Sequence, residues 1–322
     1  MGGVRADSGA FMFCRAWSGP KPGHDHERNQ DAYEVRQVRD ASGGNGVLLA
    51  ISDGASSTVH AGPWARALVA TAELDWPSLD DQTLTARLDA ARQRFPLAQP
   101  DDLPWYIAHK LAREGSQAAL LVASFTPAPG TDEILVRTVA VGDCSLVVFR
   151  RDGSVASFPV SASTDFGFRP RLISTRPQPG LQYDRWAASV ERGDVVVACT
   201  DAVGRWTLEA VEAADTKSFF SLLLDVLDED RTPEPSMRPA GDDLFRRLAE
   251  SAGQRRLQED DVTLVLCVPT APRSAGTAHD LARATLKGHL SGDLERLFQA
   301  PPAWRAWVIA TVERARRAIR LG

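Results

Sequence analysis

Cysteine is scarce in this chain of 322 residues. The four cysteines, Cys14, Cys144, Cys199 and Cys267, are far apart and form no C-x-x-C pair, which argues against a zinc site or a dithiol redox motif of that type. Three of them lie in or beside apolar segments. We therefore expect reduced, buried thiols in a cytoplasmic protein rather than a disulfide framework.

Long apolar runs and a strong charge imbalance are also missing. No run approaches the roughly 18 residues that span a bilayer, and no basic start with an apolar core marks a signal peptide. The net charge is −5 and the pI about 5.7, so the whole chain is not built to bind a polyanion. We expect no membrane and no nucleic-acid partner, and the oligomeric state stays open.

Short runs rich in Val, Ile and Leu are present and predict β-strands. They cover residues 31–38, 46–52, 118–125, 134–141, 145–150, 155–160, 194–200 and 261–268. The connections at 142–144 and 151–154 are too short for a parallel crossover, so these strands pair antiparallel. Helical patterns cover 61–75, 82–94, 105–115, 207–228 and 242–257. We predict an α+β fold of two packed antiparallel β-sheets flanked by helices.

The composition changes near the C-terminus, where no strand pattern follows residue 276. Helices are expected at 278–298 and 303–320, separated by Pro301 and Pro302. We therefore divide the chain into a main domain, 1–270, and a C-terminal helical extension, 271–322. The extension either docks on the domain with a solvated basic face or binds a partner.

Aspartates recur at the boundaries of the predicted strands. Because antiparallel neighbours alternate in direction, starts and ends of different strands can meet at one edge of the sheets. Carboxylates gathered there would repel one another unless a divalent cation compensated. Oxygen ligands suit Mg²⁺ or Mn²⁺, and a glycine after an aspartate lets its carbonyl approach an ion. The residues concerned are Asp31, Asp53 with Gly54, Asp143, Asp201, Asp260 and Asp261.

The ordered set "NQDAYEV", "LLAISDGA", "AVGDCSLVVF", "VVVACTDAVG" and "EDDVTLVLC" resembles the PP2C-type metal-dependent protein serine/threonine phosphatases, in a divergent bacterial branch. The resemblance covers about residues 12–268. It implies a PP2C-like α-β-β-α sandwich with two Mg²⁺ or Mn²⁺ ions at one edge, and some bacterial members bind a third ion. By position, Asp53 matches the aspartate that bridges the two metals, and Gly54 matches the carbonyl donor. Asp201 and Asp260 match ligands of the first metal, Asp31 lies near the second, and Asp143 matches a ligand of the third.

The phosphate-binding part departs from that pattern. His26 stands where better-known members have an arginine, and Arg28 is an alternative phosphate contact. His26 is an equally good candidate for a proton donor or for a plain surface residue. Ala55, Ser56 and Ser57 replace the usual pair of glycines. Of the two roles open to the serine hydroxyls, a contact with phosphate or a cap on the following helix, we expect the cap. Gln30 replaces a carboxylate, which lowers the local negative charge.

The resemblance implies hydrolysis of phosphoserine and phosphothreonine by a water that the metals activate at Asp53 and Asp201. The substrate would be a phosphorylated protein, in signalling opposite a kinase. The altered phosphate contacts leave an alternative: a pseudophosphatase that binds phosphoproteins with little turnover. A third hypothesis is an interaction protein whose C-terminal helices bind the partner.

Overall fold

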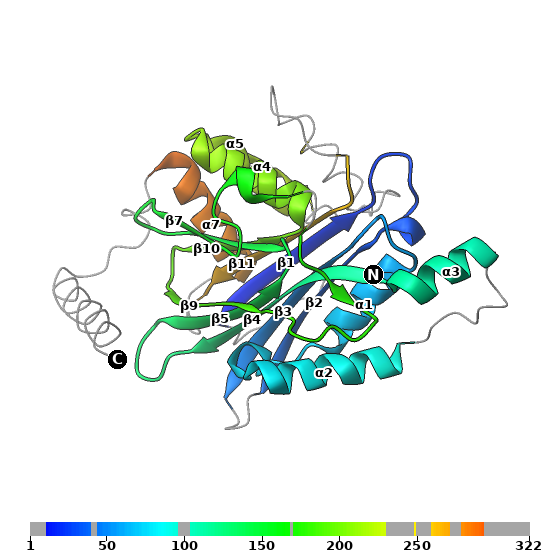
Figure 1. The fold of residues 1–322 in the computed structure, drawn as a ribbon. Helices are drawn as coiled ribbons and strands as arrows, with labels where there is room; N and C mark the ends of the chain where they lie inside the picture. Colours follow the sequence, from blue (N-terminus) through cyan, green and yellow to red (C-terminus); the bar gives the residue numbers. More distant parts are fainter. Residues whose placement is uncertain are drawn as a thin grey trace.

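The computed structural model describes residues 11–39, 44–95, 104–167, 170–229, 248, 259–270 and 278–292. Its described strands form two antiparallel sheets (Figure 1). The first has the order β1-β11-β10-β6-β7, with β1 Met12–Gly19, β6 Ser145–Phe149, β7 Val155–Phe158, β10 Val195–Cys199 and β11 Val262–Pro269. The second has the order β2-β3-β4-β5-β9, with β2 Asp31–Arg39, β3 Asn45–Gly54, β4 Gln117–Pro127, β5 Ile134–Val141 and β9 Asp184–Val190; the short β8, Ile173–Ser174, pairs with β4.

The sheets pack face to face because alternate residues of their strands are apolar. Leu49 and Ile51 of β3 meet Val196 and Val265 of the other sheet in a buried cluster. Each large apolar side chain buried in this way contributes roughly 1.5–3 kcal/mol. The predicted two-sheet α+β architecture is confirmed.

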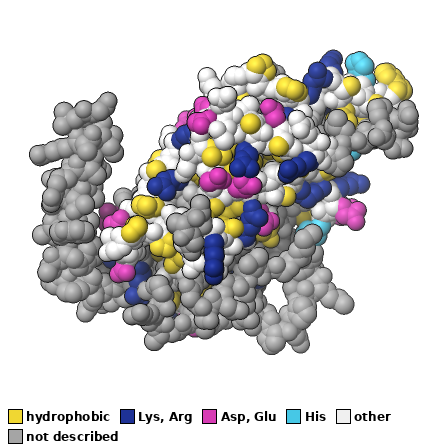
Figure 2. All heavy atoms as spheres, turned by 90° about the horizontal axis from the view of Figure 1, so that it is seen from below, with side chains coloured by type: hydrophobic (Ala, Val, Ile, Leu, Met, Phe, Trp, Pro, Cys, Tyr) yellow, Lys and Arg dark blue, Asp and Glu magenta, His cyan; other side chains and the backbone are white. Residues whose placement is uncertain are grey.

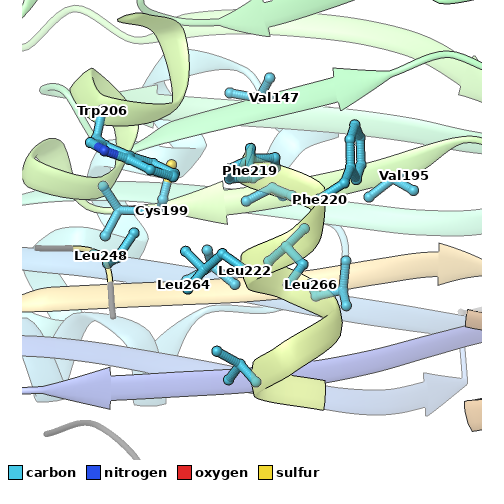
Figure 3. Close-up of a cluster of buried hydrophobic side chains, with 14 of the residues drawn as sticks. Val147, Val195, Cys199, Trp206, Phe219, Phe220, Leu222, Leu248, Leu264 and Leu266 are labelled. Atoms are coloured by element: carbon cyan, nitrogen blue, oxygen red, sulfur yellow. The ribbon is translucent and has the colours of Figure 1, made fainter. Parts of the chain in front are cut away.

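Helices cover both outer faces (Figure 1). On the β2–β9 sheet lie α1 Ala61–Thr71 and α2 Asp81–Arg94, and α3 Trp105–Glu114 projects beyond the sheet. On the other sheet lie α4 Asp201–Glu212, α5 Thr216–Glu229 and α7 Ala278–Ser291. Figure 3 shows the second layer, where Trp206 of α4 and Phe219 of α5 pack over Leu264 and Leu266 of β11. Within the described residues, no helix is both long and apolar enough to span a membrane.

The first helix of the C-terminal extension packs on the domain. On α7, Arg283 forms a two-bond ion pair with Asp228 of α5, at 2.6 and 2.7 Å. His289 stacks on Phe220, with ring centroids 4.6 Å apart. The predicted helix 303–320 lies outside the described residues, as does most of 242–257. The division into a domain and an extension stays a prediction.

The surface seen from below Figure 1 carries both signs of charge. Acidic and basic side chains are interspersed among apolar and polar ones over the described part of this face (Figure 2). This part of the surface is therefore not a single-sign field of the kind that attracts a polyanion.

Candidate functional site

Two strands of one sheet present carboxylates side by side. Asp31 is the first residue of β2, and it lies directly opposite Asp53, the penultimate residue of β3. Asp53 is on the same strand face as Leu49 and Ile51, which point into the space between the sheets. The pair therefore lies at the open end of the inter-sheet core, where like charges would repel.

The other sheet and the crossing between the sheets supply the remaining aspartates. Asp201 lies two residues after the end of β10, as the first residue of α4, and Asp260 lies two residues before the start of β11. Asp143 lies on the short connection from β5 to β6, which passes from one sheet to the other. Gly142 makes that connection possible, because its φ of +102° suits glycine and a Cβ would lie 2.6 Å from Ala119 Cβ.

Asp53 interacts electrostatically with the other aspartates, so these carboxylates lie close together. Burial raises the pKa of Asp53 well above its ordinary value, and the charges of four other aspartates raise it further: Asp31, Asp201, Asp143 and Asp260. The four come from four separate parts of the chain, and both sheets contribute. The structure thus brings together the aspartates that the strand-boundary pattern singled out, while their role as metal ligands stays a prediction.

The same crowding acts on the partners of Asp53. Burial, with the charges of Asp143 and Asp260, raises the pKa of Asp201 to about 7. Burial also raises the pKa of Asp143 to about 6. Arg205 opposes both shifts, since its positive charge lowers the pKa of Asp201 and of Asp143. Burial raises the pKa of Asp260 as well, against the nearby charge of Lys21.

A buried chain of hydroxyls and amides fixes the Asp31 carboxylate. Thr200 Oγ1 donates to Asp31 Oδ2 at 2.9 Å and accepts from the Thr263 backbone N–H at 3.1 Å. Thr200 is the residue before α4, where a threonine usually caps the helix, yet its side chain makes no capping bond. Its hydroxyl therefore holds a site carboxylate instead. Asn29 accepts a bond from the Asp31 N–H at 2.9 Å and so fixes the backbone of the same residue.

Asp261 and Gly54 fix the backbone around the site. The Asp261 carboxylate accepts backbone N–H bonds from Lys21 at 2.8 Å and Gln30 at 2.7 Å, which ties β11 to the segment before β2. Gly54 lies so close to the chain that a Cβ would be 2.7 Å from the Ala61 carbonyl carbon and 2.9 Å from the Gln30 oxygen. Only glycine fits there, and its carbonyl follows Asp53 directly.

The predicted phosphate contacts lie on an exposed turn. His26 and Arg28 belong to the 3₁₀ turn His26–Arg28, where the Arg28 side chain is 66% exposed and faces Asp25 at 3.9 Å. Their proposed roles stay predictions. The expectation that Ser56 caps the following helix is wrong: α1 begins at Ala61 after His60, and Ser56 Oγ donates to Gln30 Oε1 at 2.7 Å.

Sequence reasoning missed Arg205, the cation whose charge acts on Asp143 and Asp201. It lies four residues after Asp201 on α4, so the two side chains share one face of the helix. Its Nη2 donates to the Phe166 carbonyl at 2.7 Å. The signal was visible in "TDAVGRW", because a basic residue one helical turn after a buried aspartate is close enough to pair with it.

The donor atoms suit a hard divalent cation in kind. They are buried and partly buried carboxylate oxygens and a backbone carbonyl, with partial charge compensation by Arg205 and Lys21. Among the residues that the structure describes, however, no three His, Cys, Asp or Glu side chains form a group ready to hold a metal ion.

Comparison with known proteins gives structural likeness only. No protein-family model matches the chain, and no curated protein matches it. Among solved structures it is similar to the catalytic domain of the serine/threonine protein phosphatase PstP with two manganese ions, at 17% identity and a TM-score of 0.42 over 81% of this chain and 100% of that chain.

Two further structures extend the comparison. Serine/threonine phosphatase Stp1 from Staphylococcus aureus has 12% identity and a TM-score of 0.47 over 84% of this chain and 100% of that chain. The PP2C phosphatase domain of SpoIIE from Bacillus subtilis, with a fragment of its regulatory domain, has 13% identity and a TM-score of 0.44 over 80% of this chain and 63% of that chain. These are proteins of the type that the sequence motifs resemble. Such identities and scores are too low to carry a function, which has to be argued from the side chains.

Proposed function

We propose that the chain is a metal-dependent phosphatase that hydrolyses phosphoserine and phosphothreonine in proteins. The observation that supports it best is the gathering of Asp31, Asp143, Asp201 and Asp260 around the partly buried Asp53. Collecting mutually repelling carboxylates in a partly buried place lowers the stability of the fold, and a bound dication removes the repulsion.

In this proposal Asp53, which lies among aspartates positioned by both sheets, would contact two Mg²⁺ or Mn²⁺ ions. The Gly54 carbonyl, Asp201 and Asp260 would complete one ion's protein ligands, and Asp31 would lie at the other. When bound, the ions would supply a water of lowered pKa as the nucleophile and neutralise charge on the phosphoryl oxygens. Asp143 would serve a third ion, if one binds.

The chain's own residues would hold these groups in place. Thr200 fixes the Asp31 carboxylate, and Asp261 anchors the segment that carries Gln30. The substrate would be a phosphorylated protein, a kinase or its targets.

The direct test is hydrolysis of a phosphothreonine peptide with Mn²⁺ and with a chelator. We expect turnover that depends on the metal and is absent with chelator. If Mn²⁺ binds by calorimetry but no phosphate is released, the proposal is wrong and the pseudophosphatase alternative is favoured.

We further propose that Arg205, rather than Arg28, contacts the substrate phosphate. Its guanidinium carries five N–H donors, of which one bonds to Phe166. It lies beside Asp143 and Asp201, whereas Arg28 faces Asp25 on an exposed turn. Arginine suits this role because its planar fork matches phosphate oxygens.

Replacing Arg205 with alanine is expected to raise KM for the phosphopeptide by roughly 10- to 100-fold, the loss of one charge-assisted contact. Arg205→Lys should recover part of this loss. Arg28→Ala is the matched control and should change KM less than threefold. A larger effect at Arg28 than at Arg205 would assign the phosphate contact to the exposed turn instead.

A further inference from the structure

Two of the four cysteines are cross-strand neighbours, although they are far apart in the sequence. Cys14 of β1 lies directly opposite Cys267 of β11. Both are free thiols, with Cys267 buried and Cys14 partly buried. Both side chains pack in the cluster between the two sheets.

The hydrogen-bond ladder identifies the type of this pair. The Thr270 N–H donates to the Phe11 carbonyl, and these residues continue the β1–β11 register as an opposed, hydrogen-bonded pair. Pair types alternate along an antiparallel ladder, so Cys14 and Cys267, three positions further along, form a non-hydrogen-bonded pair.

Two other residue pairs of the β1–β11 ladder agree with this alternation of pair types. Pro269, which has no N–H to donate, is opposite Met12 at another non-hydrogen-bonded position. Ser18 Oγ and Thr263 Oγ1 are 2.8 Å apart across a third such position. Side chains approach most closely at these positions, where opposite Cα atoms are about 4.5 Å apart.

That spacing allows a covalent bond between the sulfurs. Disulfides span Cα separations of about 4.4–6.8 Å, so the backbone need not move. Cys14 is only partly buried, whereas Cys267 is buried, and a hydrogen bond with Cys14, followed by burial, raises the pKa of the Cys267 thiol well above its ordinary value. Cys14 is therefore the thiol that an external reagent meets first.

We propose that Cys14 and Cys267 form a reversible cross-strand disulfide on exposure to a low-molecular-weight disulfide such as oxidised glutathione. The Cys14 thiolate attacks one glutathione sulfur, and the first glutathione leaves as a thiol. The Cys267 sulfur, after losing its proton, attacks Cys14 and releases the second glutathione thiol. One disulfide is thus exchanged for another, and two glutathione thiols are released.

The disulfide would hold β1 and β11 in the register that positions the candidate site. On the same ladder face, four residues from each cysteine, Ser18 contacts Thr263, and the Thr263 N–H bonds to the hydroxyl of Thr200 that holds Asp31. The bond would also join strands separated by most of the chain, where a crosslink restricts the unfolded state most. The oxidised protein should therefore be the more stable form.

Tryptic mapping of the full chain after incubation with oxidised glutathione tests the proposal. Each cysteine falls in its own peptide: 6–15, 138–150, 193–205 and 257–273. We expect peptides 6–15 and 257–273 to be linked, with the mass of two hydrogens lost and two free thiols left in the unfolded protein. A lasting glutathione adduct on Cys14, a link to another cysteine, or four unreacted thiols would each overturn the proposal.

Variants separate the pair from a general effect of oxidation. Oxidised wild type should melt roughly 5 °C or more above its reduced form, and dithiothreitol should reverse the shift. Cys14→Ala should show no link and no shift, and Cys267→Ala should stop at the glutathione adduct on Cys14. Cys144→Ala is the matched control, since that thiol is buried elsewhere, and it should behave as wild type. An equal shift in Cys14→Ala would contradict the proposal.

Discussion

Replacing Asp53 with asparagine is expected to lower Mn²⁺-dependent kcat/KM for a phosphothreonine peptide by about 1,000-fold or more. Asparagine keeps the size of the side chain and removes the charge that faces Asp31, Asp201, Asp143 and Asp260. A loss of that size is about 4 kcal/mol of transition-state stabilisation, which is reasonable for the central ligand of a metal centre. Calorimetry should show weaker Mn²⁺ binding in the same variant.

Asp132→Asn is the matched control for this experiment. Asp132 is an exposed carboxylate in the turn between β4 and β5, at the far end of the strand that pairs with Asp53. Its variant should keep wild-type activity. If Asp53→Asn keeps more than a tenth of the activity, Asp53 is not a ligand of a catalytic metal and the proposed function fails at its centre.

Apolar runs in the sequence predict most of the strands. The strands β1, β8 and β9 were not predicted, because they lack a continuous apolar run. β1 is interrupted by Arg15, and β9 is an edge strand with exposed residues such as Arg185 and Ala187. β8 is two residues long and exists only through its pairing with β4. Edge and very short strands are stabilised by their partners, and a single-sequence pattern does not contain that information.

One of the predicted helices is divided into two helices in the structure. The expected helix 207–228 is divided at Ala213–Asp215 into α4 and α5, and Ala214 has a φ of +54°. Alanine is a strong helix former and gives no warning of this turn. α4 also begins earlier than expected, at Asp201, which places that carboxylate in the first turn, where the helix dipole favours negative charge.

The site was predictable to the extent that it follows strand boundaries. The aspartates could be found because antiparallel topology brings strand ends to one edge. Thr200 could not be ranked in the same way, because its importance depends on a contact across the fold: it reaches Asp31 over 169 residues of sequence. The pairing of Cys14 with Cys267 was missed for the same reason.

The stability of the metal-free protein is expected to fall as the pH rises from about 4 to 8. Burial and mutual repulsion raise the pKa of Asp201 to about 7, of Asp143 to about 6, and of Asp31 and Asp53 well above their ordinary value. The folded state therefore binds more protons than the unfolded state in this range. The stabilisation is complete below the unfolded pKa and is lost as the pH rises through the folded pKa.

Urea unfolding at pH 5, 6, 7 and 8, with chelator and with Mn²⁺, measures this loss. One pKa unit is about 1.4 kcal/mol, so the cluster should cost the chelated protein a few kcal/mol by pH 8. Mn²⁺ should restore most of it, because a dication compensates the ionised carboxylates. Asp53→Asn should be more stable than wild type at pH 8 with chelator, although it is inactive, and should gain less from Mn²⁺.

This opposite response of stability and activity distinguishes a metal centre from a structural cluster. If the carboxylates served only to hold the fold together, removing Asp53 would destabilise the metal-free protein and Mn²⁺ would not matter. Other groups also titrate in this range: burial lowers the pKa of His289, which gives a slope of opposite sign. The decisive quantity is therefore the difference in pH slope between Asp53→Asn and wild type, with Asp132→Asn matching wild type. Equal slopes for Asp53→Asn and wild type with chelator would show that Asp53 does not share the charge of the cluster.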